Sequence, residues 1–126
     1  MKAITATEYL MGRAAIDDLS EHERANLSEL LNVVNNLLAD FGEYRKVNSG
    51  YRRSIDNNAA GGAKGSAHLT CQAVDLEDKD GELQAFCTLE VLEKYDLYAE
   101  EDPKGIRNWV HLQTRPVRSG KRIFIP

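Results

Sequence analysis

Three polar residues stand out because their neighbours along the chain are glycine-rich or apolar. His68 follows a glycine-rich segment, Asp75 lies in an otherwise apolar stretch, and His111 lies in a stretch that alternates between apolar and other residues. Taken singly, such residues are more often structural than ligating. Together, two imidazoles and one carboxylate match the three-ligand set of catalytic zinc, which keeps a fourth position for water. Zinc in such a site can lower the pKa of its bound water to about 7 and polarise an amide carbonyl.

Three segments of the chain resemble one known family. The residues Ser66-Ala67-His68 and Gln72-Ala73-Val74-Asp75 resemble the Ser-x-His-x-x-Gly-x-Ala-x-Asp signature of the zinc D-alanyl-D-alanine carboxypeptidases and L-alanyl-D-glutamate endopeptidases. Many phage endolysins belong to this family, and the Hedgehog signalling domain shares its fold. Ser49-Gly50-Tyr51-Arg52 and Trp109-Val110-His111-Leu112-Gln113 are similar to its upstream and downstream segments. The resemblance spans roughly residues 45–113 in the correct order.

The resemblance implies a role for each matching residue. His68, Asp75 and His111 would bind Zn²⁺, and Arg52 and Ser66 would help to hold the substrate. An arginine guanidinium can bind a peptide carboxylate through two parallel hydrogen bonds. The family's substrate is the carboxylate-rich stem peptide of bacterial peptidoglycan, and its activity is that of a zinc metallopeptidase. Which peptidoglycan bond is cut stays open, because carboxypeptidases and endopeptidases of the family share these ligands.

The first departure from the family pattern is Cys71, which stands where the signature has glycine. Glycine in such a place points to a backbone conformation that side chains resist. His68 and Asp75 are an odd number of steps apart, so on one straight strand they would face opposite ways. We therefore expect a bend between them. Cys71 is either a small buried residue or, since thiolates bind zinc, a further ligand.

The second departure is Asn108, which replaces an acid that many members carry three residues before the last histidine. Asparagine cannot act as a general base. Asp102 and Glu101 lie just upstream in a predicted loop, and loops commonly carry catalytic groups. We expect one of them to be the catalytic base, with Asp102 ahead of Glu101. The alternative is that both belong to an exposed acidic turn before Pro103.

Two other functions remain open at this point. A binding or structural protein of the same fold could keep zinc and lack catalysis, as the Hedgehog domain illustrates, and Asn108 is its main support. A hydrolase acting on a different amide is the third hypothesis.

Apolar periodicity predicts a helix over residues 21–41, started by a Ser20/Glu23 capping box and ended by Gly42. Shorter helices are expected over 5–13 and 82–95, with a connector over 14–20 and a long loop over 49–67. Strands are expected over 44–48, 72–76, 97–100, 109–113 and 122–125. This pattern predicts an α+β fold, a small and mostly antiparallel sheet flanked by helices, in one domain over residues 1–126.

Composition excludes several classes. The 126 residues are 42% hydrophobic and 29% charged, which is typical of a globular protein. With a net charge of −4, we expect no nucleic-acid partner. No apolar run reaches the roughly 18 residues that span a bilayer, so no membrane partner is expected. Two cysteines make no disulfide framework. The first residues lack a signal-peptide core, so we expect a monomer that stays in the host cytoplasm before its release to the cell wall.

Overall fold

The longest helix, α2 (Glu21–Phe41), has the bounds that its sequence predicts. The Ser20 hydroxyl accepts a hydrogen bond from the backbone N–H of Glu23, and the Glu23 carboxylate accepts one from the N–H of Ser20. Gly42 ends the helix in the left-handed conformation, with φ 94°. The apolar face of α2 is buried through Leu27, Leu30, Leu31, Val34, Leu37 and Leu38. The computed structural model describes all 126 residues.

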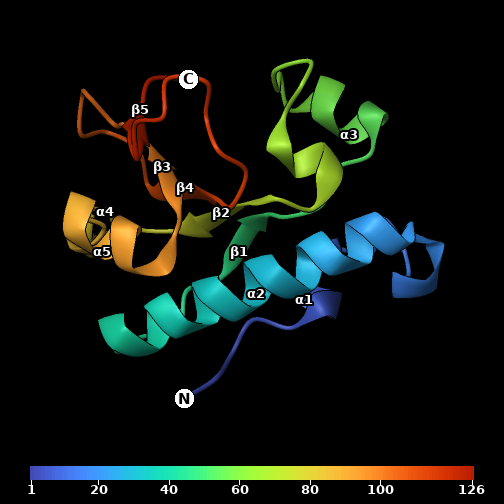
Figure 1. Cartoon of the computed structure of the whole chain (residues 1–126), viewed down its shortest axis with the longest axis horizontal. Coiled ribbons are helices and arrows are strands. Elements are labelled where there is room, and N and C mark those ends of the chain that lie inside the picture. Colours follow the sequence, from blue (N-terminus) through green and yellow to red (C-terminus); the bar gives the residue numbers. More distant parts are fainter.

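Five short strands form one sheet in the order β1-β2-β4-β3-β5 (Figure 1). Their bounds are Val47–Ser49 for β1, Ala73–Glu77 for β2, Tyr98–Glu100 for β3, Trp109–Gln113 for β4 and Ile123–Phe124 for β5. Three neighbouring pairs are antiparallel, whereas β5 runs parallel to β3. The predicted α+β class is confirmed. The sheet is mixed rather than mostly antiparallel, because the chain after β4 crosses over β3 and adds β5 as an edge strand that runs parallel to β3.

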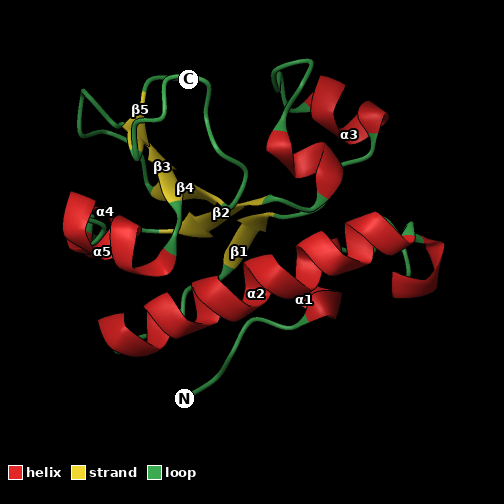
Figure 2. Cartoon of the chain, in the orientation of Figure 1, coloured by secondary structure: helices red, strands yellow, loops and turns green.

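The other helices are short and differ in part from the sequence prediction (Figure 2). They are α1 (Ala6–Leu10), α3 (Ser54–Ala59), α4 (Glu82–Phe86) and α5 (Leu89–Tyr95), with single 3₁₀ turns at Ile16–Asp18 and Ala67–Thr70. The predicted helix over 82–95 is broken, because the Thr88 hydroxyl caps a new helix by accepting from the N–H of Val91. The predicted loop over 49–67 contains α3. No helix has the length and apolar character needed to cross a bilayer.

One face of the sheet packs into the hydrophobic core, and the other carries the candidate site residues. Val74, Leu76, Val110 and Leu112 are fully buried in the core that the leucines of α2 share. Figure 1 shows α2 along this side, whereas α3 and the C-terminal segment rise on the other. Asp75 and His111 alternate with those core residues and therefore point to the opposite face. The core thus fixes the strands from which the candidate site projects.

Candidate metal centre and its pocket

The candidate centre is built first on strand pairing. Asp75 of β2 and His111 of β4 are direct partners in the antiparallel ladder. Side chains of such partners leave the same face of the sheet and lie close together. The Nδ1 atom of His111 lies 2.8 Å from Oδ1 of Asp75. Register alone therefore brings an imidazole against a carboxylate.

The third residue, His68, comes from the 3₁₀ turn Ala67–Thr70 and not from a strand. The Ser66 hydroxyl starts this turn by accepting a hydrogen bond from the N–H of His68. Cys71 ends it with φ 60° and ψ 33°, the left-handed conformation. This is the bend that the odd spacing to Asp75 requires. It places Nε2 of His68 3.3 Å from Oδ1 of Asp75.

One candidate donor atom from each of His68, Asp75 and His111 lies within 4.8 Å of the other two. The three side chains are also well buried, with exposed fractions of 2%, 8% and 8%. The ring centroids of the two histidines are 5.2 Å apart. These three residues are therefore close enough to share one ion.

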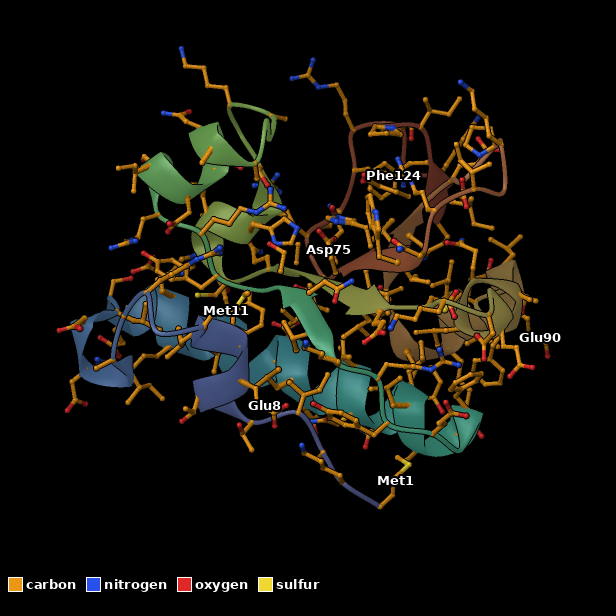
Figure 3. All side chains as sticks on the ribbon, turned by 180° about the vertical axis from the view of Figure 1, so that it is seen from behind. Met1, Glu8, Met11, Asp75, Glu90 and Phe124 are labelled. Atoms are coloured by element: carbon orange, nitrogen blue, oxygen red, sulfur yellow. The ribbon has the colours of Figure 1, made fainter.

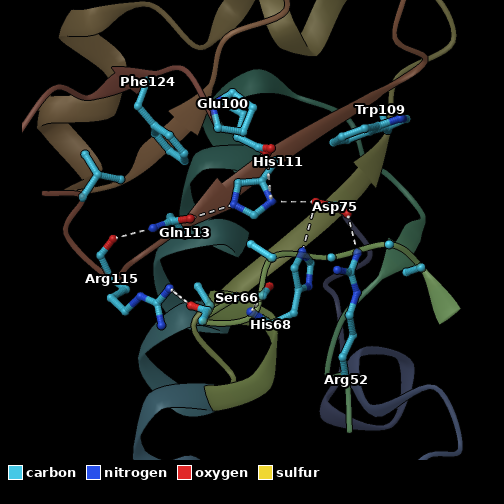
Figure 4. A pocket seen from close by; sticks show the side chains of 18 of the residues that line it. Arg52, Ser66, His68, Asp75, Glu100, Trp109, His111, Gln113, Arg115 and Phe124 are labelled. Carbon is cyan, nitrogen blue, oxygen red and sulfur yellow. Dashed lines mark hydrogen bonds and ion pairs between the residues drawn. The ribbon is translucent and has the colours of Figure 1, made fainter. Parts of the chain in front are cut away.

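Hydrogen bonds on the outer sides of the two rings indicate which nitrogens are free. The Nδ1–H of His68 donates to the carbonyl of Gly50 at 2.8 Å. Nε2 of His111 lies 2.7 Å from Oε1 of Gln113, as Figure 4 shows. The inner nitrogens of both histidines then face the same oxygen of Asp75. A nitrogen lone pair facing a carboxylate oxygen needs a proton or a cation between them. Two imidazole nitrogens and one carboxylate oxygen fit the donor set of zinc.

Electrostatics within the trio support the same interpretation. Burial alone would raise the pKa of Asp75, but hydrogen bonds from His111 and His68 hold that pKa well below its usual range. Burial opposes the charged form of His111, yet the Asp75 carboxylate raises the pKa of His111 above its ordinary value. A metal ion binds in place of such a shared proton, because its ligands must be deprotonated.

Arg52 holds the other oxygen of the carboxylate. Its Nη2 donates to Oδ2 of Asp75 at 3.4 Å, while its remaining groups donate to Ser49 at 3.0 Å and to Asn57 at 3.2 Å. The guanidinium lines the pocket, and each of its three nitrogens makes one of these bonds, which leaves one further N–H on Nη1 and one on Nη2. Oδ1 of Asp75 is thereby left as the oxygen that faces the two histidines.

The trio lies in a pocket of about 580 Å³. Figure 3 shows Asp75 near the centre of the view, with Phe124 above it on the C-terminal segment. Four arginine side chains but only two acidic side chains line the pocket: Arg52, Arg107, Arg115, Arg118, Asp75 and Glu100. Ser66 also lines it. This volume is in the ordinary range for ligand sites, and the excess of positive charge favours an anionic ligand.

Glu100, at the end of β3, is the pocket carboxylate that the sequence prediction missed. Its Oε2 lies 3.9 Å from Nδ1 of His111, and its Oε1 lies 3.9 Å from Nη1 of Arg107. Glu101 and Asp102 are not among the pocket-lining residues. Asp102 instead accepts from the N–H of Arg107 at 3.1 Å and holds the loop.

Glu100 follows Ala99, the partner of Leu112 in the β3/β4 ladder, so strand alternation puts its side chain on the same face as His111. This can be inferred only once β3 is known to pair with β4. Gln113 was missed as well, although it shares the face of Trp109 and His111 in the alternating pattern.

Cys71 is not part of the metal-binding group. Its side chain is fully buried in the core cluster. Burial raises the pKa of the thiol to about 12, which disfavours the thiolate that would bind a metal.

Comparison with known families decides the class of the chain. A family model described as peptidase M15 matches residues 5–113. The chain belongs to the peptidase M15 family. No curated protein matches it significantly. The resemblance to zinc D-alanyl-D-alanine carboxypeptidases inferred from sequence is thus confirmed, and this member of the M15 family is a hydrolase of the metallopeptidase class.

Proposed function

We propose that this M15 peptidase is zinc-dependent, hydrolyses peptide bonds of bacterial peptidoglycan, and uses His68, Asp75 and His111 as its metal ligands. One observation carries the proposal: two imidazole lone pairs and one carboxylate oxygen converge in a pocket rich in arginine. When bound, the metal supplies Lewis acidity, which polarises a peptide carbonyl and makes water a better proton donor.

Peptide hydrolysis also needs a group that takes a proton from water and passes it to the leaving amine. We assign this task to Glu100, because its carboxylate lies in the pocket 3.9 Å from His111, with Nη1 of Arg107 3.9 Å from its other oxygen. Glu101 and Asp102, the candidates from sequence, lie outside the pocket lining. The main argument for a protein without catalysis is that Asn108 replaces the family's usual acid. A carboxylate at Glu100 would supply the missing base.

The proposed substrate contacts follow from which polar groups are free. Ser66 accepts from the His68 N–H and keeps its own hydroxyl hydrogen for a ligand. Arg107, Arg115 and Arg118 bring positive charge to the pocket, which suits the carboxylates of stem peptides. Arg52 donates three of its five N–H groups to protein atoms, so it can hold Asp75 and still offer one N–H on each of Nη1 and Nη2 to a substrate carboxylate.

Purified protein incubated with isolated bacterial cell walls tests the proposal. We expect release of new amino groups in zinc, loss of that release in a chelator, and recovery when zinc is restored. His111→Ala should abolish the release, whereas His22→Ala should leave it unchanged, since His22 is exposed on α2 far along the chain from the pocket strands. Zinc binding without amino-group release would contradict the proposed activity and favour the alternative, a zinc protein that lacks catalysis.

The family resemblance extends the proposal to wall lysis of the phage-endolysin type. Mass spectrometry of the soluble products identifies the bond. Release of free D-alanine would indicate a carboxypeptidase, and stem peptides cut between L-alanine and D-glutamate would indicate an endopeptidase. Intact stem peptides throughout would exclude both.

A further inference from the structure

Gln113 is a buried amide that the proposed chemistry does not use. It is the last residue of β4 and only 6% exposed. Its two ends contact different partners: Nε2 donates to the carbonyl of Arg115 at 2.7 Å, and Oε1 lies 2.7 Å from Nε2 of His111. Both ends of this buried amide are therefore hydrogen-bonded, and one of them contacts the candidate metal ligand His111.

The orientation of this amide is determined by its neighbours. A backbone carbonyl can only accept a hydrogen bond, so the NH₂ end of Gln113 must face Arg115. Oε1 then faces His111, and an amide oxygen can only accept. Nε2 of His111 must therefore carry a hydrogen.

This hydrogen decides which nitrogen of His111 is left for a metal. Neutral imidazole carries one hydrogen, so an Nε2–H leaves a lone pair on Nδ1. Nδ1 is the atom that faces Oδ1 of Asp75 at 2.8 Å. In His68 the carbonyl of Gly50 does the opposite, because it holds the hydrogen on Nδ1 and frees Nε2. The two rings thus need opposite tautomers, and only that of His111 depends on a side chain.

We propose that Gln113 is the positioning residue that fixes His111 in its Nε2–H tautomer and thereby presents Nδ1 to the metal. The inference rests on the metal site of the proposed function and not on its peptidase activity. Hydrogen-bond partners of metal-ligating histidines fix ring orientation, and their loss typically weakens metal affinity 10- to 100-fold.

The test compares three variants of the full chain with the wild type. Gln113→Met keeps the size of the side chain but removes the strong acceptor, and Gln113→Glu keeps an acceptor oxygen. Gln84→Met, on α4 and outside the pocket lining, is the matched control. Zinc affinity is measured by competition with a chelator, and thermal unfolding of the metal-free proteins shows that each variant folds. Two-bond proton–nitrogen spectra of histidine-labelled protein identify the tautomers.

We expect the zinc-loaded wild type to show His111 with its hydrogen on Nε2 and His68 with its hydrogen on Nδ1. Gln113→Met should lower zinc affinity about 10- to 100-fold and lose the protected Nε2–H signal of His111, with the His68 signal unchanged. Gln113→Glu should retain that signal, and Gln84→Met should match the wild type.

An Nδ1–H tautomer of His111 in the zinc-loaded wild type, or an unchanged signal and affinity in Gln113→Met, would overturn the inference. These outcomes are separate from the proposed function. Zinc binding with the expected tautomers but without wall cleavage would leave the role of Gln113 intact. If the wild type bound no zinc, both the metal site and the proposed role of Gln113 would be overturned.

Discussion

The neighbouring acids at the end of β3 differ sharply in surroundings although they are adjacent in sequence. Glu100 ends the strand with its carboxylate in the pocket, 3.9 Å from His111. The backbone N–H of Glu101 donates to Phe124 at 2.7 Å, and its side chain is outside the pocket lining. Strand alternation sends successive side chains to opposite faces. Glu100 is therefore a candidate proton acceptor, whereas the adjacent Glu101 lies outside the pocket.

We expect Glu100→Gln to lower the rate of amino-group release from cell walls about 10²- to 10⁴-fold, the usual contribution of a general base. The amide keeps the shape of the side chain but cannot take a proton. Zinc affinity should stay close to that of the wild type, because Glu100 is not one of the three ligands. The measurement is an initial rate on isolated walls, with zinc binding assayed on the same preparation.

Glu101→Gln is the matched control and should keep nearly full activity. Full activity in Glu100→Gln, or its loss in Glu101→Gln or Asp102→Asn with zinc still bound, would return the role of base to the loop that the sequence indicated.

At the scale of elements, the glycine-rich segment positions Arg52, which in turn donates a hydrogen bond to the candidate metal ligand Asp75. A Cβ on Gly62 would collide with Oδ1 of Asn57 and lie 2.8 Å from Nη1 of Arg52. Asn57 in turn donates to the carbonyl of Ala63 at 2.9 Å, which closes the segment over α3. The close approach of Gly62 thus lets Asn57 and Arg52 meet beside Asp75.

Gly62→Ala should therefore destabilise the protein by about 1–3 kcal/mol, the usual effect of overpacking a tight site. It should also weaken zinc binding, because Arg52 must move away from Asp75. Denaturant unfolding and chelator competition measure the two effects. Gly65→Ala is the comparison, since a Cβ there meets nothing within 4 Å. Equal behaviour of the two variants would show that the Arg52 contact does not depend on this approach.

Elements with a strong local signal were predictable from sequence. The bounds of α2 followed from its caps and its apolar period, and the alternation of β4 predicted the face that carries His111. The bend at Cys71 followed from spacing, and the structure supplies it through a left-handed residue. In contrast, α3 lies in a segment rich in glycine, asparagine and alanine with little amphipathic pattern. Its N-terminus depends on Asp56 pairing with Arg53, a contact with a weak sequence signal.

Features that depend on which strands are neighbours were not predictable from local pattern. The parallel pairing of β5 with β3 and the approach of Glu100 to His111 both follow from the order β1-β2-β4-β3-β5. The contact between Arg115 and the carbonyl of Gly65 likewise joins the end of β4 to the glycine-rich segment. Long-range placement of this kind comes from packing of the whole chain, whereas the three candidate ligands could be proposed from residue types and a resemblance.

For the molecule as a whole, a metal joining three separate segments should add to global stability. His68 lies on the 3₁₀ turn, Asp75 on β2 and His111 on β4, so one ion would link the glycine-rich segment to the centre of the sheet. A ligand that binds only the folded state stabilises it by about 2.7 kcal/mol at a concentration 100 times its Kd. Removal of zinc should lower the melting temperature by roughly 10 °C at this saturation.

The size of this zinc effect should depend on pH in a stated direction. The pKa of His111 is raised above its ordinary value of about 6.5, with burial opposing and the Asp75 carboxylate causing the increase. In the metal-free protein the charged His111 therefore stabilises the fold below about pH 6.5, and this contribution is lost as pH rises through the raised folded pKa. Zinc needs the deprotonated ring, so its stabilising effect should be small near pH 5 and large near pH 8.

Thermal unfolding with zinc and with a chelator, repeated across this pH range, measures the difference between the two melting temperatures. That difference should grow with pH in the wild type and in His22→Ala, and it should be close to zero at every pH in His111→Ala. A zinc effect of equal size near pH 5 and pH 8 would mean that no proton leaves His111 when the metal binds. The ion would then lie elsewhere than between the two imidazoles and Asp75.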